Sequence, residues 1–169
     1  MQLVVPAIMT AADERLEVAL QSCCRDIGVE SLKEHQREAI VSFVDGNDVL
    51  VCLPTGYGKS LCFAVLPLVF DYLRERRGSI VICVSPLTSL MMEQKSKFTP
   101  RGLMVDFVGE MQHDLKSIEN VQCGRVQLLY ISPESILRNP QWRDMLLTDV
   151  YQENLVAIAV DEAHCIARW

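Results

Sequence analysis

The sequence contains few residues of the kinds that build a zinc site, a disulfide framework or a membrane span. Its seven cysteines form no C-x-x-C pair and no Cys/His spacing typical of zinc, so we expect no zinc and read them as reduced core thiols. The N-terminus lacks the basic start and cleavage site of a signal peptide. The longest apolar run, residues 61–70, has about half the length of a membrane span. These absences favour an intracellular protein with no membrane partner.

Positive charge is also scarce. The chain has 16 Lys and Arg against 22 Asp and Glu, a net charge of −6. A nucleic-acid-binding protein usually carries a basic face, so this charge argues against unspecific coating of DNA and leaves room for a local basic groove. With 169 residues, 50% of them hydrophobic and 22% charged, the chain is long enough and apolar enough for one globular domain with a buried core.

Apolar stretches alternate with helical stretches along most of the chain. Strands are expected at residues 49–53, 79–84, 103–108, 126–131 and 155–160. Strands that are apolar throughout and separated by helices indicate an α/β fold with a parallel sheet covered by helices on both faces. One helix is expected from a cap at Thr10 to about Arg25, and another behind a capping box formed by Ser31 and Glu34. In such a sheet, ligands collect at the carboxyl ends of the strands.

The stretch DVLVCLPTGYGKSLCF, residues 48–63, has the order of a phosphate-binding loop: buried strand, glycine-punctuated turn, helix. Gly56 and Gly58 would let backbone N–H groups turn toward phosphate oxygens. Lys59 would reach the β- and γ-phosphates, and the Ser60 hydroxyl would ligate Mg²⁺. The strict pattern G-x-x-x-x-G-K-[ST] fails at Leu53, which stands at its first position. The alternative is a chance glycine turn between a strand and a helix.

A second set of candidate residues follows the last expected strand. Asp161 and Glu162 come directly after a buried strand, where carboxylates are costly unless they hold a cation or a proton. Asp161 would bind Mg²⁺ opposite Ser60, Glu162 would orient and deprotonate an attacking water, and His164 could link the nucleotide to a neighbouring element. The alternative is an acidic helix N-terminus, a position that Asp and Glu favour.

Three further residues have both a functional and a structural interpretation. Gln36 could pair through its amide with an adenine edge, whereas an exposed helical Gln is usually only solvated. Ser85 and Ser132 each follow an expected strand and precede a proline. Taken singly, each is better explained as a helix cap.

These stretches together resemble a superfamily 2 helicase, specifically the first RecA-like domain of a RecQ-family DNA helicase. The resemblance covers residues 27–169 in the correct motif order. The matching stretches are IGVESLKEHQ (adenine recognition), LPTGYGKSLCF (motif I), VSPLTSLMMEQ (motif Ia), LLYISPESIL (motif Ib) and DEAHCIARW (motif II). In this superfamily the first position of motif I need not be Gly, which accounts for Leu53.

The resemblance implies an ATP-dependent 3′-to-5′ DNA helicase that uses ATP and Mg²⁺ and acts on single-stranded and duplex DNA, in the nucleus. It implies an ATP-binding domain at residues 27–169 behind a helical extension at 1–26. Catalysis would rest on Lys59, Asp161, Glu162 and His164, with Ser60 and Asp161 at the metal. The implied nucleotide-binding residues are Lys33, Gln36, Pro54, Thr55, Gly56, Tyr57, Gly58, Lys59 and Ser60, and the implied DNA contacts are Ser85, Pro86, Ser132, Pro133 and Glu134.

The sequence departs from the family pattern at several positions. Ile27 and Leu32 replace aromatic residues of the adenine motif, Lys33 replaces an arginine, and Tyr57 stands where the family usually has Gly. The chain ends before the motif III strand, which in this family lies between the motif I and motif II strands. We therefore expect these two strands either to close up or to leave a gap.

Two other functions remain open from the sequence. The chain could be a nucleotide-binding interaction module that hydrolyses nothing, which the acidic charge and the missing second domain would favour. It could also be an inactive fragment that arises from an incomplete gene.

Overall fold

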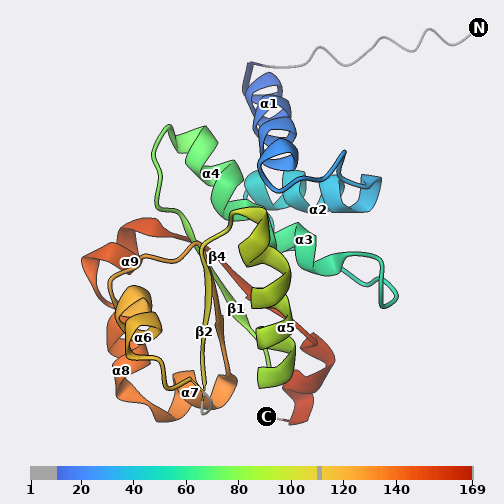
Figure 1. Ribbon diagram of the computed structural model, residues 1–169. Helices are drawn as coiled ribbons and strands as arrows, with labels where there is room; N and C mark the ends of the chain where they lie inside the picture. The colour runs from blue at the N-terminus through green and yellow to red at the C-terminus, as the bar shows by residue number, and fades with distance from the viewer. Residues whose placement is uncertain (1–10, 110–111, 169) are drawn as a thin grey trace, which may run out of the picture.

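The computed structural model describes residues 11–109 and 112–168, and its centre is a four-stranded sheet. The strands are β1 (Ile80–Val84), β2 (Val105–Val108), β3 (Leu128–Ile131) and β4 (Leu155–Val160). Their order across the sheet is β2-β3-β1-β4, and every neighbouring pair is parallel. The predicted parallel sheet is therefore confirmed (Figure 1).

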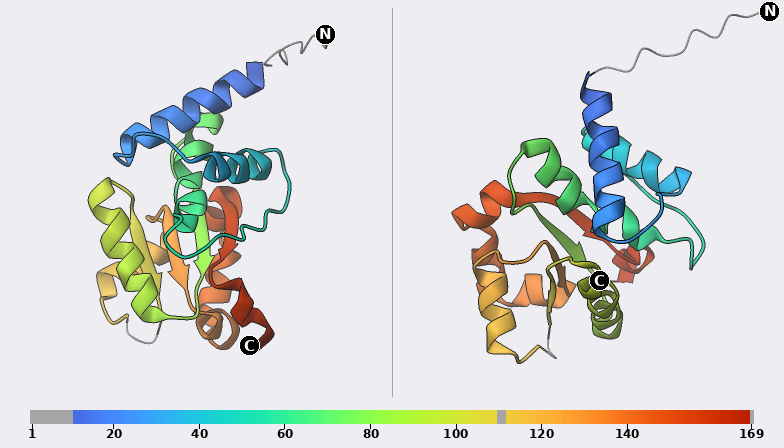
Figure 2. Two further views of the ribbon diagram at one scale, coloured as in Figure 1. Left: turned by 90° about the vertical axis from the view of Figure 1, so that its right-hand side faces the viewer. Right: turned by 45° about the horizontal axis from the view of Figure 1, so that its top comes forward.

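Helices cover both faces of this sheet, as the uniformly apolar strands require (Figure 2). Two separate hydrophobic clusters lie on the two faces. One cluster joins the sheet to α1, α2, α3, α4 and α5, and the other joins it to α6, α8 and α9. The helices are α1 (Ala11–Asp26), α2 (Glu34–Val44), α3 (Lys59–Ala64), α4 (Leu66–Arg74), α5 (Thr88–Phe98), α6 (Leu115–Gln122), α7 (Pro133–Arg138), α8 (Pro140–Leu146) and α9 (Asp149–Asn154), with 3₁₀ turns η1 (Thr99–Arg101) and η2 (Ala163–Arg168).

The first helix, α1, packs on α4 (Figure 1) and contributes to the same core as the sheet. Ala19, Leu20 and Cys23 are buried in the cluster that also contains Val81 and Leu128 of the strands. The helix predicted to end near Arg25 ends at Asp26. Its predicted cap, Thr10, lies outside the described residues. The division of the chain at residue 26 stays a prediction, although α1 shares its core with the rest.

The predicted strand at 49–53 is wrong, because this segment forms no regular structure. A strand needs a neighbour to pair its backbone N–H and C=O groups. Within the described residues, β4 ends the sheet on this side, so the segment has no strand to pair with. Leu50 is 80% exposed, and on β4 Ile158 is 61% exposed. A cavity of about 720 Å³ separates the two segments. The segment at 49–53 and strand β4 therefore do not close up against each other; a gap separates them, which was one of the two expected outcomes.

The start of α2 also differs from the prediction. The helix begins at Glu34 rather than behind Ser31, and its N-cap is Lys33. The Gln36 side chain accepts a hydrogen bond from the Lys33 N–H over 2.9 Å. The capping box expected for Ser31 and Glu34 is therefore replaced by one two residues later, in which Lys33 is the N-cap and Gln36 is the third helical residue.

The cysteines are all free thiols in the structure, but they do not all lie in the core as predicted. Cys23, Cys24, Cys62 and Cys83 are buried, whereas Cys52 and Cys123 are exposed. Burial raises the pKa of Cys23 to about 12, with the nearby Asp26 adding to the effect. Across the described residues, no helix is both long enough and apolar enough to cross a bilayer.

Two fully buried tyrosines differ in how their hydroxyl groups are satisfied. Tyr151 of α9 donates to the backbone oxygen of Val121 over 2.6 Å, which ties α9 to the end of α6. The hydroxyl of Tyr130 on β3 has no hydrogen-bond partner among the described residues. A buried hydroxyl group without a hydrogen-bond partner destabilises the folded state, whereas a hydrogen bond offsets this cost.

Replacing each tyrosine by phenylalanine is therefore expected to give opposite results. Tyr151→Phe removes the bond to the Val121 oxygen, which keeps the Gly124 N–H as its donor, and should lower the free energy of unfolding by about 1 kcal/mol. Tyr130→Phe removes an unpaired polar atom from the core and should be neutral or stabilising. Urea unfolding followed by circular dichroism measures both. Equal destabilisation by the two substitutions would contradict this account.

Candidate nucleotide site

The predicted phosphate-binding loop, residues 54–58, turns through two glycines in the left-handed region. Gly56 has φ 85° and Gly58 has φ 84°, values that residues with a Cβ rarely adopt. Gly58 is the N-cap of α3, and the Leu61 N–H donates to its backbone oxygen over 3.0 Å. The loop therefore leads directly into a helix, with its glycines at the positions where the backbone reverses.

Lys59, the first residue of α3, has its ammonium group folded back onto the loop. The Nζ atom donates to the backbone oxygen of Leu53 over 2.8 Å and to that of Pro54 over 3.2 Å. Ser60 follows it in the same helical turn and is half-buried. A positive charge and a hydroxyl group are thus held at the base of the glycine loop.

The two acidic residues lie at the carboxyl end of β4. The Asp161 N–H donates to the Val84 oxygen over 2.9 Å and so continues the pairing of β4 with β1. One carboxylate oxygen of Asp161 accepts from the Glu162 N–H over 3.0 Å. Glu162 has φ 52°, a left-handed backbone that is uncommon for a residue with a Cβ. Its carboxylate lies 3.2 Å from the Nδ1 atom of His164.

The acids and the loop face one cavity, the same one that separates residues 49–53 from β4. Pro54, Thr55 and Lys59 line it on one side, and Asp161, Glu162 and His164 line it on the other. Partial burial raises the pKa of Asp161. The hydrogen bond from the Glu162 N–H opposes this rise, the charge of the Glu162 carboxylate adds to it, and the nearby Lys59 opposes it. Lys59 and the two acids are therefore brought together around one space. The other predicted nucleotide-binding or metal-binding residues that do not line it are Lys33, Gln36, Gly56, Tyr57, Gly58 and Ser60.

The side chains at this cavity could ligate Mg²⁺, which needs few protein ligands. They could not surround a metal that takes all of its ligands from the protein. Within the described ranges no cluster of three or more His, Cys, Asp or Glu side chains could hold a metal. Mg²⁺ is commonly held by one or two carboxylates together with water and substrate phosphates. Asp161, a half-buried carboxylate with a raised pKa, is a suitable ligand because a cation would relieve its burial. The residues present fit such an ion.

Gln36 joins the adenine motif to the phosphate loop. Its side chain is 3% exposed, and its Nε2 atom donates to the Gly58 oxygen over 3.1 Å while its Oε1 atom accepts from Lys33. A Cβ added at Gly58 would lie 2.6 Å from the same Nε2 atom. The amide therefore holds the loop close to α2, and Gly58 is required for this approach as well as for its φ angle.

Sequence reasoning missed a cluster on the α2 side of the loop. The Lys33 ammonium lies 5.6 Å from the centre of the Tyr57 ring, and the His35 ring lies 6.3 Å from it. The His35 Nε2 atom is 3.3 Å from the Tyr57 backbone oxygen. Lys33 and Tyr57 were both expected among the nucleotide-binding residues, but their contact with each other and with His35 was not predicted. An aromatic residue between two loop glycines was the available signal.

The predicted DNA contacts lie at the rim where the parallel strands end. Val84 of β1 is paired with Ile131 of β3 on one side and with Val160 of β4 on the other, so Ser132, Ser85 and Asp161 follow one another in that order along this rim. Their arrangement follows from the strand register, and their role toward DNA stays a prediction.

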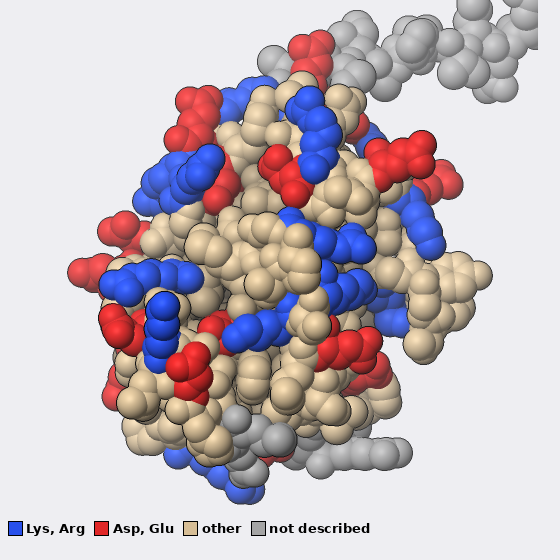
Figure 3. Space-filling view, viewed as in Figure 1, with Lys and Arg blue, Asp and Glu red and all other residues tan. Residues whose placement is uncertain are grey.

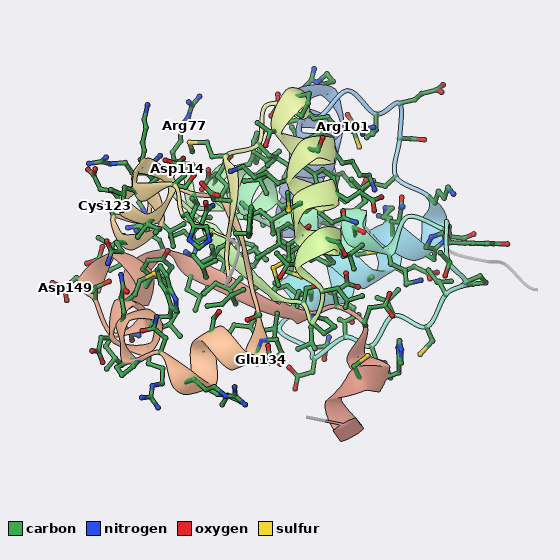
Figure 4. All side chains as sticks on the ribbon, turned by 60° about the horizontal axis from the view of Figure 1, so that its bottom comes forward. Arg77, Arg101, Asp114, Cys123, Glu134 and Asp149 are labelled. Carbon is green, nitrogen blue, oxygen red and sulfur yellow. The ribbon has the colours of Figure 1, made fainter. Side chains whose placement is uncertain are left out.

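The serine side chains at this rim are buried. The Ser85 hydroxyl has no partner among the described residues, and the Ser132 hydroxyl accepts from the Ser135 N–H as the cap of α7. Pro86 is half-buried and Pro133 is buried, whereas Glu134 is exposed. Figure 4, which views the molecule from the rim, shows Glu134 at the start of α7.

Charge on the face shown in Figure 3 is mixed. Basic side chains gather over α5, and acidic side chains surround them. Lys95 and Lys97 lie in the last turn of α5, where Lys95 pairs with Asp106 over 2.8 Å. This pairing uses part of the basic charge for packing within the protein.

A parallel sheet with a glycine loop and a carboxylate pair at one cavity defines a nucleotide-binding α/β domain. The chain belongs to the DEAD/DEAH box helicase family, whose profile matches residues 33–169. It is 35% identical over 146 residues to "ATP-dependent DNA helicase RecQ" of Haemophilus influenzae, covering 84% of this chain and 22% of that protein. It is 34% identical over 142 residues to "ATP-dependent DNA helicase Q-like SIM" of Arabidopsis thaliana, covering 84% of this chain and 15% of that protein.

The RecQ-type resemblance drawn from the motifs is confirmed by these matches. The chain spans 22% and 15% of the length of the two relatives. Among solved structures, the DUF1998 helicase MrfA bound to DNA and AMPPNP superposes with a TM-score of 0.66 at 20% identity, over 92% of this chain and 22% of that one. At this identity the superposition supports the fold, which is that of a RecA-like lobe.

The contact between Gln36 and Gly58 can be tested by placing a Cβ at Gly58. Gly58→Ala should lower the free energy of unfolding by about 1–2 kcal/mol for the left-handed backbone, and by about 1 kcal/mol more because the buried Gln36 amide must give up a hydrogen bond. Urea unfolding measures both effects.

Gly46→Ala is the matched control, because Gly46 has φ 91° and open space at the Cβ position. It should show the backbone cost alone. In a Gln36→Ala background the excess cost at Gly58 should disappear. An excess that persisted there would show that Gln36 is not its cause.

Proposed function

We propose that this chain is the ATP-binding lobe of an ATP-dependent 3′-to-5′ DNA helicase of RecQ type. The observation that carries the proposal is the single cavity lined by Lys59 of the glycine loop and by Asp161 and Glu162 after β4. Phosphoryl transfer needs positive charge around the phosphates and a positioned nucleophile, and both kinds of side chain lie there. The strand polarity and a nuclear location are carried over from the family resemblance alone.

Lys59 is the residue that binds the triphosphate. In the structure its ammonium group is paired with the backbone oxygens of Leu53 and Pro54. Phosphate oxygens carry full charge and compete well with carbonyl groups for an ammonium donor. On nucleotide binding, Lys59 releases these carbonyls and turns to the β- and γ-phosphates, while the loop N–H groups at Gly56 and Gly58 donate to the same phosphates.

Ser60 and Asp161 would hold the magnesium ion that accompanies ATP. When bound, Mg²⁺ neutralises the charge that develops on the phosphates. Asp161 is fixed at the rim by its backbone bond to Val84 and by its own carboxylate bond to the Glu162 N–H. Its carboxylate is therefore held at the cavity before any ligand enters.

Glu162 acts as the general base. A carboxylate at the cavity can accept the proton of a water that attacks the terminal phosphate. His164 lies 3.2 Å from this carboxylate and limits its rotation. His164 thus positions Glu162 and connects it to the η2 turn.

Single-stranded DNA is proposed to bind along the rim next to the nucleotide, at the turns that carry Ser85, Pro86, Ser132, Pro133 and Glu134. The register of β1, β3 and β4 supports this, because it aligns the strand ends in one row with Asp161. Duplex DNA and any unwinding belong to the activity proposed for the whole protein.

Lys59→Ala should abolish ATP binding and lower hydrolysis stimulated by single-stranded DNA at least about a hundredfold, as expected when a charge-stabilising donor is lost. A coupled assay for released ADP measures this. Lys116→Ala, an exposed lysine of α6 on the opposite face of the sheet, is the control and should match the unaltered chain. Hydrolysis unchanged by Lys59→Ala would exclude this site as its source. ATP binding by the unaltered chain without turnover would instead favour the nucleotide-binding interaction module.

Asp161→Asn should remove the dependence of ATP binding on magnesium. In the unaltered chain, calorimetric titration with ATP is expected to give tighter binding with Mg²⁺ than with EDTA. In the variant the two affinities should converge, because the amide keeps the shape of the carboxylate and loses its charge. A variant that kept the full magnesium effect would place the ion elsewhere.

A further inference from the structure

The loop carries one large side chain that the phosphate chemistry does not use. Tyr57 lies between Gly56 and Gly58, and its side chain is 49% exposed rather than packed into the core. Loop positions next to bound phosphates are otherwise filled by small residues here, which allow close approach of the backbone. A half-exposed aromatic ring at this place has a flat face available to a ligand.

The Tyr57 ring is in contact with two side chains near the start of α2. The Lys33 ammonium lies over the ring at 5.6 Å, within the range of a cation–π interaction. The His35 ring is tilted by 47° to it at 6.3 Å. The Tyr57 oxygen accepts a hydrogen bond from the His35 Nε2 atom when that nitrogen carries the proton. Contacts from α2 therefore set the position of the ring.

We infer that Tyr57 is the residue on which the base of the bound nucleotide stacks, with Lys33 beside it. The inference rests on the proposed function, because it requires the phosphates of that nucleotide to lie in the loop. The base then lies on the α2 side of the loop, over the Tyr57 ring.

The apolar residues of the adjoining segment do not provide such a face. Ile27 is 2% exposed and belongs to the core, and Leu32 is aliphatic and packs against the same core. Tyr57 takes over stacking from the chain segment that precedes α2. The aromatic surface is thereby supplied by the phosphate loop itself.

Stacking on an aromatic ring and hydrogen bonding to a base differ in how well they distinguish one base from another. Every base has a π-face, so an aromatic ring binds different bases with similar strength. The Gln36 amide, in contrast, would distinguish adenine by its N6 and N7 groups. In the structure this amide is engaged by Gly58 and Lys33. Tyr57 therefore contributes to ATP and GTP alike.

The test compares three ligands, ATP, GTP and inorganic tripolyphosphate, by calorimetric titration of the full chain. Tyr57→Ala should weaken ATP and GTP by the same factor, about tenfold for the loss of one base–aromatic stack. Its affinity for tripolyphosphate, which has no base, should be unchanged. Tyr57→Phe should restore both nucleotide affinities. Tyr72→Ala, at an exposed tyrosine of α4, is the matched control and should alter none of the three.

The outcomes separate the inference from the proposed function. If Tyr57→Ala weakens tripolyphosphate as much as ATP, the residue shapes the loop and does not stack, and the inference is overturned. Unchanged nucleotide affinity in this variant overturns it as well. A loss confined to ATP, with GTP retained, would also contradict base-tolerant stacking. If the unaltered chain binds neither ATP nor tripolyphosphate, the proposed function fails, and the inference fails with it.

Discussion

The hydrogen bond from the Asp161 N–H to the Val84 oxygen is the contact on which the candidate site depends. It extends the pairing of β4 with β1 by one residue past the end of the strand. Because β1 is itself paired with β3, the position of Asp161 is determined by the register of the sheet. The acids are thus carried by the end of a paired strand, and the glycine loop that faces them is held by side chains, through Gln36 and Lys59.

The loop is in turn attached to the helical layer by the amide of Gln36. This side chain spans from the start of α2 to Gly58, and it is nearly fully buried. Movement of α2 would therefore reach the phosphate loop through one side chain. Lys33, His35 and Tyr57 are in contact next to this Gln36–Gly58 hydrogen bond, so the position of the Tyr57 ring and the shape of the loop are linked.

Much of this architecture could be predicted from the sequence because it depends on local patterns. Runs such as Ile80–Val84 are apolar at every position, which indicates a strand buried on both faces and hence a parallel sheet. Gly-Lys-Ser at a turn before a helix, and Asp-Glu after an apolar run, identified the two halves of the site. The register placed both halves at one cavity, as the order of the elements had suggested.

Other features could not be predicted because they depend on contacts between distant residues. Residues 49–53 have the composition of a strand, but a strand also requires a neighbour, and the described part of the chain offers none there. The start of α2 was misplaced because Gln36 caps it while also binding Gly58, a residue 22 positions away. Likewise, no local pattern shows that Tyr57 meets Lys33 and His35.

The outer edge of β4 has one further consequence, for handling the chain in solution. Ile158 and Val160 are exposed beside backbone groups that no described strand pairs with. An open, apolar strand edge is a template for another strand, including one from a second copy of the same chain. This edge therefore limits the solubility of the chain at high concentration. A polar residue in place of Ile158 would raise the solubility without disturbing the buried face of the sheet.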